Sequence, residues 1–150
     1  MTSRGDSSDA ERAAGAHVRS EAARWVRAGA AVGALSVLTG AFGAHGLKNV
    51  ASSEQLAWWD TASSYALAHA LLLGLVGWLS ERVPSSSSRW AGRLVLGGVL
   101  VFSGTLWTMG LGGPRWLGAV TPIGGVSLVL GWACLFVAAG GLRSTSDRSG

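Results

Sequence analysis

The sequence predicts an all-α integral membrane protein: an antiparallel bundle of four transmembrane helices with both termini in the cytoplasm. Three observations support this prediction. Hydrophobic residues make up 49% of the chain and charged residues only 13%, about half the charged share of a soluble domain. Four stretches contain no Asp, Glu, Lys or Arg, and each is long enough to cross about 30 Å of hydrocarbon as a helix. Ten of the 12 basic residues fall on one side of the resulting topology.

The four uncharged stretches are the expected membrane spans. Helices are expected because backbone groups in lipid must pair within their own segment, and the stretches lack the alternation of barrel strands. The rest of the chain divides into a mobile basic tail over residues 1–24, a four-helix membrane domain over 25–142 and a second tail over 143–150. Residues 10–25 could instead extend the first helix into the cytoplasm. The predicted spans cover residues 28–47, 61–80, 94–111 and 117–142.

The basic residues predict the orientation. The two segments expected outside the cytoplasm carry only Lys48 and Arg115. Because cytoplasmic loops are enriched in Lys and Arg, this asymmetry places both termini and the middle loop in the cytoplasm, with their basic residues against anionic lipid. Nucleic acid is not an expected partner, despite a sequence pI of about 10.6, since no basic patch is interleaved with aromatic residues on a folded surface.

The link between the first two spans contains signals for both helix ends. The first span closes with Gly40–Lys48, whose glycines permit close backbone contact with a neighbouring helix. Ser52 followed three residues later by Gln55 forms a capping box, so the second helix is predicted to begin near Ser53. Basic and indole side chains favour the headgroup region. The expected interface anchors are Lys48, Trp58, Trp59, Arg115 and Trp116.

The second half of the chain is expected to form two antiparallel neighbours, because the link Gly112–Arg115 is short. The serine run Ser85–Ser88, after Pro84, is expected to be a flexible connector. Pro122 lies inside the last span and cannot donate a hydrogen bond to the carbonyl of Gly118, so a kink is predicted there.

Small residues at four-residue spacing are expected to bring the helices together, because membrane helices associate where backbones can approach closely. Each predicted helix carries such residues. The predicted packing residues are Gly29, Gly33, Gly40, Gly43, Ala62, Ala66, Ala70, Gly74, Gly104, Gly124 and Gly125.

Polar residues inside the predicted spans are few, and they form the one candidate site. Thr61, Tyr65 and His69 lie at i, i+4 and i+8 on the second helix, Asp60 precedes them, and His45 ends the first helix. Ionisable groups in a membrane are functional candidates. Two interpretations are open: a short proton or ligand path from Asp60 through Tyr65 to His69, or a set of interhelical hydrogen bonds that fixes helix register.

Catalysis and cofactor binding are not expected. No carboxylate pair lies in the spans for general acid–base work, and no Cys or third His falls where it could complete a zinc site. His69 lies about 12 Å deeper than Thr61 at 1.5 Å per residue, whereas His45 is near the external interface. Haem ligands need similar depth, so this pair does not suit haem. We therefore expect neither an enzyme, nor a metal, nor a cofactor.

Several sequence blocks resemble one family of small membrane proteins. The longest are Gly40–Lys48 and Arg115–Gly125. Shorter ones are Glu54–Leu56, Trp58, Thr61-Ala62, Tyr65, His69-Ala70 and Phe102–Leu106. Over residues 26–142 the chain is similar to domain of unknown function 423, also called uncharacterised protein family 0382, which includes bacterial inner-membrane proteins and the eukaryotic transmembrane protein 256. The resemblance implies a four-helix inner-membrane protein and brings no activity, substrate or cofactor.

Two departures from the family pattern bear on the candidate site. The family tends to have a basic residue just before the tyrosine and an aromatic residue just before the histidine of the second helix. Here these positions are Ser64 and Ala68. A polar network built on those side chains would be thinner in this chain, which weakens the proton-path interpretation.

Two function hypotheses follow. The first is a structural or accessory membrane subunit without catalytic activity, with lipid as its surroundings and a second copy or other membrane proteins as candidate partners. The second is a small transporter or channel subunit, in which Tyr65, His69 and His45 line a path beside the break at Pro122, since interrupted helices mark many transporter sites.

Overall fold

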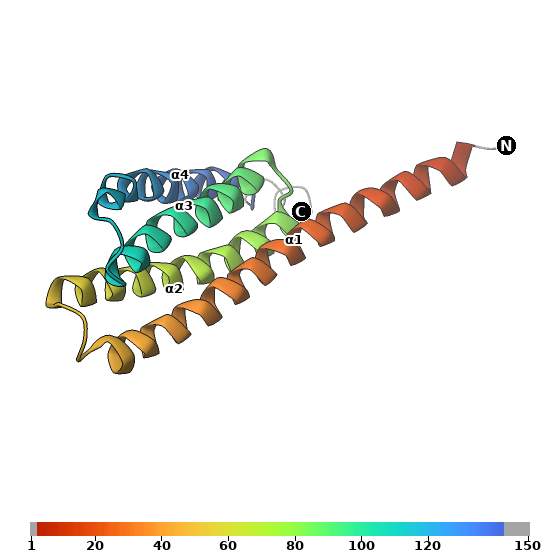
Figure 1. Ribbon diagram of the computed structural model, residues 1–150. Helices are drawn as coiled ribbons and strands as arrows, with labels where there is room; N and C mark the ends of the chain where they lie inside the picture. The colour runs from red at the N-terminus through yellow and green to blue at the C-terminus, as the bar shows by residue number, and fades with distance from the viewer. Residues whose placement is uncertain (1–2, 143–150) are drawn as a thin grey trace.

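The computed structural model describes the backbone of residues 3–142 and the side chains of residues 9 and 12–142. Four long helices and two short ones make up this part of the chain, so the predicted all-α class is confirmed (Figure 1). All four long helices are long and apolar enough to cross a membrane. The helices are α1 (Ser3–Phe42), the π-helix η1 (Gly43–Leu47), α2 (Ser53–Arg82), α3 (Ser86–Gly110), the 3₁₀ helix η2 (Arg115–Ala119) and α4 (Thr121–Ala139).

The long helices pack mainly against their neighbours in sequence: α1 on α2, α2 on α3 and α3 on α4. The two middle helices therefore supply most of the core, and α1 and α4 form the edges of the bundle. Leu73 and Val76 of α2 and Val95 of α3 are fully buried at its centre. Ala62 and Ala66 are also fully buried, which places the predicted small-residue face of α2 inside the bundle.

The first helix is longer than predicted. α1 begins at Ser3, so residues 3–24 continue the helix where the sequence analysis placed a mobile tail. This corresponds to the alternative extension over residues 10–25, and the Ala, Glu and Arg content of the segment explains it, because these residues are strong helix formers. The N-terminal part of α1 projects past the ends of the other helices (Figure 1). The predicted tail over residues 143–150 lies outside the described residues.

Capping boxes begin both α2 and α3. The Gln55 backbone N–H donates to Ser52 Oγ at 3.2 Å, and the Ser52 N–H donates to Gln55 Oε1 at 2.9 Å, so the predicted start near Ser53 is confirmed. Ser85 and Ser88 make the same reciprocal pair. The serine run is therefore a helix start and not the flexible connector expected from the sequence. A serine that accepts from an N–H three residues later satisfies a donor that the first turn leaves free.

The helix break at Pro122 differs from the predicted kink. α4 begins at Thr121, and Pro122 occupies its first turn, preceded by the 3₁₀ helix Arg115–Ala119. A proline in the first turn requires no carbonyl partner, because the N–H it lacks would be unpaired there. Pro122 therefore starts a helix where the sequence analysis placed a kink within a continuous one.

Replacing Pro122 with Ala is expected to change the free energy of unfolding by less than about 1 kcal/mol, because only the stiffness of the unfolded chain is altered. Relief of an interior kink would instead add a hydrogen bond and stabilise the protein, by up to about 3 kcal/mol. Thermal unfolding of the purified variant in detergent distinguishes the two. A large gain in stability would contradict the helix-start geometry.

Glycines set the closest contacts between helices. A Cβ at Gly29 would lie 2.6 Å from the Ala70 carbonyl oxygen, and one at Gly124 would lie 2.5 Å from the Phe102 backbone nitrogen. In contrast, a Cβ at Gly74 or Gly104 would meet nothing within 4 Å. Neither position therefore needs glycine to avoid a clash, although the Gly74 backbone lies close to α1, since a Cβ at Gly29 would lie 3.3 Å from the Gly74 nitrogen.

The remaining predicted glycines make ordinary or specialised contacts. A Cβ at Gly33 would lie 3.5 Å from Ala70 Cβ, one at Gly40 4.0 Å from Ser63 Cβ and one at Gly125 3.8 Å from the Phe102 ring. These distances are normal van der Waals contacts, so the three positions could hold a methyl group. Gly43, just after the end of α1, is different, because it faces the indole ring of Trp59 from α2.

Candidate functional site

The end of α1 adopts an unusual backbone. Gly43–Leu47 forms one π-helical turn, which continues α1 and ends it before the link to α2. Such turns are rare and frequently occur at functional sites. Gly43 is buried in this turn, and a Cβ there would overlap the indole ring of Trp59. Only glycine leaves room for the ring at this place.

Trp59 is a core residue at the junction of three helices. It is buried, and its Nε1 donates to the Thr39 carbonyl oxygen at 2.6 Å, in the last turn of α1. The bond ties α2 to α1 just before α1 changes to π geometry at Gly43. The ring also packs against Phe42 and Trp107, with centroids at 5.7 and 6.4 Å. The predicted role of Trp59 as an interface anchor is therefore wrong.

A hydroxyl group of α2 joins α1, α2 and α3. Ser63 Oγ donates to the Trp59 carbonyl oxygen at 3.0 Å and accepts from Trp107 Nε1 at 3.1 Å. Thr39 Oγ1 lies 3.2 Å from the same hydroxyl, and Ser36 Oγ donates to the Ser63 carbonyl oxygen at 2.6 Å. We refer to these five residues, Ser36, Thr39, Trp59, Ser63 and Trp107, as the Ser63 cluster.

The Ser63 cluster was missed in the sequence analysis because serine and threonine are unremarkable in a helix. A usable signal was present. Ser63 lies three residues before Ala66 and seven before Ala70, on the face of the small-residue stripe. Ser36 lies between Gly33 and Gly40 on the matching face of α1. A hydroxyl on a packing face of a membrane helix finds its partner on the neighbouring helix.

One serine crosses each helix interface and donates to a backbone carbonyl. Ser36 bonds from α1 to α2 as described, Ser103 Oγ of α3 donates to the Ala62 carbonyl oxygen at 2.9 Å, and Ser127 Oγ of α4 donates to the Leu94 carbonyl oxygen at 2.8 Å. The three bonds fix the register of all four helices in sequence order.

His69 makes a polar contact inside the bundle from α2 to α4. Its Nδ1 lies 2.8 Å from the Tyr65 carbonyl oxygen, which can only accept, so Nδ1 carries the proton. Its Nε2 lies 3.3 Å from Trp132 Nε1, which can only donate, so Nε2 is the acceptor. The Tyr65 ring stacks on His69 and lies 4.7 Å from the Phe102 centroid. Both ring nitrogens of His69 are therefore engaged.

The other members of the predicted polar network are not part of this contact. Within the described residues, no hydrogen bond, ion pair or ring contact joins His45, Asp60 or Thr61 to Tyr65 or His69. His45 is exposed on η1, and Thr61 Oγ1 donates to the Ala57 carbonyl oxygen of its own helix. The structure thus brings together Tyr65 and His69 and leaves the remaining three apart.

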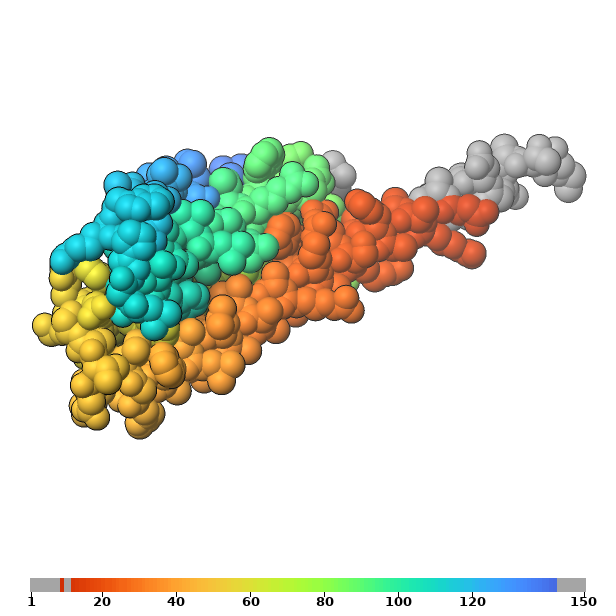
Figure 2. Space-filling view, viewed as in Figure 1, coloured from red at the N-terminus to blue at the C-terminus, as the bar shows by residue number. Residues whose placement is uncertain are grey.

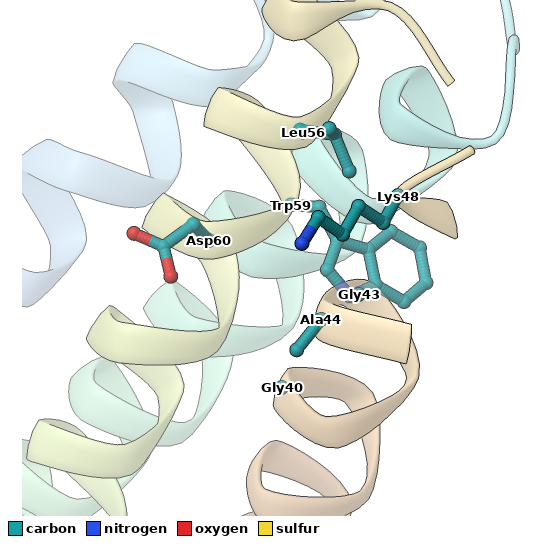
Figure 3. Close-up of a pocket in the computed structure, with 7 residues that line it drawn as sticks. All are labelled: Gly40, Gly43, Ala44, Lys48, Leu56, Trp59 and Asp60. Atoms are coloured by element: carbon teal, nitrogen blue, oxygen red, sulfur yellow. The ribbon is translucent and has the colours of Figure 1, made fainter. Parts of the chain in front are cut away.

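A cavity of about 360 Å³ opens between the end of α1 and the start of α2 (Figure 3). Lys48 extends over the Trp59 indole toward it, and Asp60 borders it from α2 (Figure 3). The two charged groups form no ion pair within 4 Å, and the other walls are apolar. The lining residues are Gly40, Gly43, Ala44, Lys48, Leu56, Trp59 and Asp60.

The same end of the bundle is closed by Arg115 of η2. Both carboxylate oxygens of Glu54 accept from Arg115 Nη2 at 2.7 Å, and the guanidinium lies 5.4 Å from the Trp58 ring centroid. These side chains are largely exposed, so the ion pair adds little to stability. Lys48 and Trp116 are exposed too. Among the described residues, no group of three or more His, Cys, Asp or Glu side chains could hold a metal ion.

These features define a class: a four-helix integral membrane protein whose helices are joined by glycine contacts and by hydroxyl and indole hydrogen bonds. The sequence model of the family described as "Protein of unknown function (DUF423)" matches residues 39–125. The chain belongs to this family, as the resemblance noted above implies. The matched range contains Thr39, Trp59, Ser63 and Trp107 of the Ser63 cluster.

The relatives carry the name UPF0382 membrane protein. One from Staphylococcus aureus (strain bovine RF122 / ET3-1) is 41% identical over 104 residues, which cover 69% of this chain and 84% of the relative. Another, from Staphylococcus haemolyticus, is 43% identical over 103 residues, with 69% and 84% covered. No solved structure is significantly similar to this chain.

Proposed function

We propose that this chain is a structural or accessory subunit of a bacterial inner membrane, without catalytic activity and with both termini in the cytoplasm. One observation carries the proposal: each interface between consecutive helices contains a serine that donates to a backbone carbonyl of the neighbouring helix. Groups engaged in this way hold helices in register and are not free to bind a solute. The charge asymmetry of the chain supports the orientation.

The geometry of His69 favours this role over transport. A transported ion or proton needs a group that can release one partner and bind another, and intramembrane ionisable groups in transporters usually face a cavity. Both nitrogens of His69 are bonded, and Tyr65 is 46% exposed on the outer surface of α2. This pair supports a register function between α2 and α4.

Site-specific photo-crosslinking in native membranes tests the proposal. A photoreactive residue at Phe136 of α4 or Leu38 of α1 is expected to capture another polypeptide, because these side chains are 84% and 68% exposed on the edge helices. The same residue at the fully buried Val95 is the matched control and is expected to give only intramolecular products.

Absence of crosslinks at both edge positions, together with a monomer in native mass spectrometry from nanodiscs, would contradict a subunit role. Proton flux into proteoliposomes that is lost in His69→Phe would favour the transporter instead. A subunit role predicts the same flux for wild type, His69→Phe and empty vesicles.

A further inference from the structure

A strongly basic cavity of about 320 Å³ lies between α1 and the start of α3, at the end of the bundle predicted to be cytoplasmic. It lies away from the Ser63 cluster and from the cavity beside Trp59. The lining residues are His17, Ser20, Glu21 and Arg24 of α1 and Arg89 and Arg93 of α3.

A tight helix contact explains how these residues meet. Trp25 is 3% exposed, and its ring fills the position where Gly92 lacks a side chain. Arg24 and Arg93, the neighbours of these two residues in sequence, are thereby brought to one place. The N-terminal part of α1 projects past the bundle (Figure 1), and the red-orange part of α1 meets the green start of α3 at this end (Figure 2).

The charges in the cavity are not balanced. Glu21 lies 3.3 Å from Arg24 and is the only acidic residue among the described side chains that line the cavity. Among the described residues, no carboxylate lies within 4 Å of Arg89 or Arg93. Arg89 donates one hydrogen bond to Ser86 Oγ at 3.0 Å, so most of its guanidinium N–H groups are available to a ligand. Like charges that line one cavity repel one another, and an anion between them would relieve the repulsion.

The type and depth of the basic groups point to phosphate. Guanidinium groups bind phosphate through two parallel hydrogen bonds, which a lysine cannot do. Arg24 lies 5.0 Å from the Trp25 ring centroid and Arg93 lies 5.4 Å from that of Trp90. Exposed tryptophans mark the level of lipid headgroups. Trp90 is 53% exposed, so its place beside Arg93 puts the cavity at the level where phosphate groups of the bilayer are found.

We propose that this basic cavity binds the phosphate group of an anionic ligand, with Arg24, Arg89 and Arg93 as its donors and a membrane phospholipid as the source nearest to it. The site is independent of the proposed subunit function. The alternative is that these arginines only form a solvated basic surface and bind no specific ligand. Arg82 serves as the control for this alternative. Arg82 lies at the same end, 4.5 Å from the Trp78 ring centroid, and outside this cavity.

Arg93→Gln and Arg82→Gln are therefore matched variants, since each removes one charge and one arginine–tryptophan contact. The full chain in detergent is titrated with phosphatidylglycerol against excess phosphatidylcholine, and bound lipid is counted by native mass spectrometry. We expect one tightly bound phosphatidylglycerol, about tenfold weaker binding in Arg93→Gln and less than about twofold change in Arg82→Gln. Arg93→Lys keeps the charge and is expected to lie between wild type and Arg93→Gln.

A second titration distinguishes the two sources of phosphate. Displacement of the bound lipid by millimolar inorganic phosphate would show that the site recognises the free anion, whereas retention would show that the lipid is the ligand; both results support the site. Equal loss in Arg93→Gln and Arg82→Gln, or equal binding of phosphatidylcholine, would overturn it. Circular dichroism of each variant checks that the helices are intact.

Discussion

Gly29→Ala is expected to destabilise the protein by about 1–3 kcal/mol, the usual effect of adding atoms to a closely packed site. The new methyl would lie 2.6 Å from the carbonyl oxygen of Ala70. That oxygen belongs to the backbone of α2, so it can move away only if the helix moves. Separation of α1 from α2 would also lengthen the bond from Ser36 to the Ser63 carbonyl.

Gly33→Ala is the control on the same helix. Its methyl would meet Ala70 Cβ at 3.5 Å, an ordinary contact. Because alanine favours a helix over glycine by about 0.5–1 kcal/mol, this variant is expected to be neutral or slightly more stable. The free energy of unfolding of both variants is measured in mixed micelles of increasing SDS fraction. Equal effects of the two substitutions would contradict the close approach at Gly29.

The same comparison can be made at the α3–α4 interface with two adjacent glycines, Gly124 and Gly125. A methyl at Gly124 would lie 2.5 Å from the Phe102 backbone nitrogen, whereas one at Gly125 would lie 3.8 Å from the Phe102 ring. We therefore expect Gly124→Ala to lower the free energy of unfolding more than Gly125→Ala does. If both pairs of variants behave in this way, the loss of stability depends on how closely the neighbouring backbone approaches each glycine. It does not come from the replacement of glycine as such.

Trp59→Phe is expected to cost about 1–3 kcal/mol, because it leaves the Thr39 carbonyl without its indole donor. Trp25→Phe is the matched control. The two indoles are 5% and 3% exposed, but Trp25 Nε1 has no hydrogen-bond partner among the described residues, whereas Trp59 Nε1 donates at 2.6 Å. Both substitutions remove the same atoms, so their packing losses are similar.

We therefore expect Trp25→Phe to change the free energy of unfolding by less than about 1 kcal/mol, since removing an unpaired buried donor offsets lost packing. Phenylalanine also keeps a ring face for Arg24, which lies 5.0 Å from the Trp25 ring centroid. The difference between the two variants in SDS unfolding measures the bond to Thr39. A Trp25→Phe variant as unstable as Trp59→Phe would contradict this assignment.

The sequence predicts most of what depends on neighbouring residues. Charge-free runs predict the four membrane helices, and the spacing of Ser52 and Gln55 predicts the start of α2, because both are local properties. The i, i+4 spacing of Tyr65 and His69 predicts their contact for the same reason. Pro122 was misplaced because a proline signal alone does not distinguish a kink from a helix start.

The remainder depends on residues that are distant in sequence. Trp59 is buried because Gly43 and Gly110 on two other helices leave space for its ring, and no feature near Trp59 indicates this. The basic cavity likewise exists only because Trp25 fits against Gly92. The Ser63 cluster depends on the relative rotation of three helices, which hydroxyl spacing alone does not determine.

The neighbour-to-neighbour packing of the helices has a consequence for how the protein is made. Each helix after α1 packs mainly on the helix synthesised just before it, so no distant segment is needed before assembly begins. A ribosome-bound chain that ends after α2 would already contain both partners of the hydrogen bond from Ser36 to the Ser63 carbonyl. It would also contain Gly43, which leaves room for the Trp59 ring. Addition of α3 would then complete the cluster with Trp107, and α4 would close the last interface, in the order of translation.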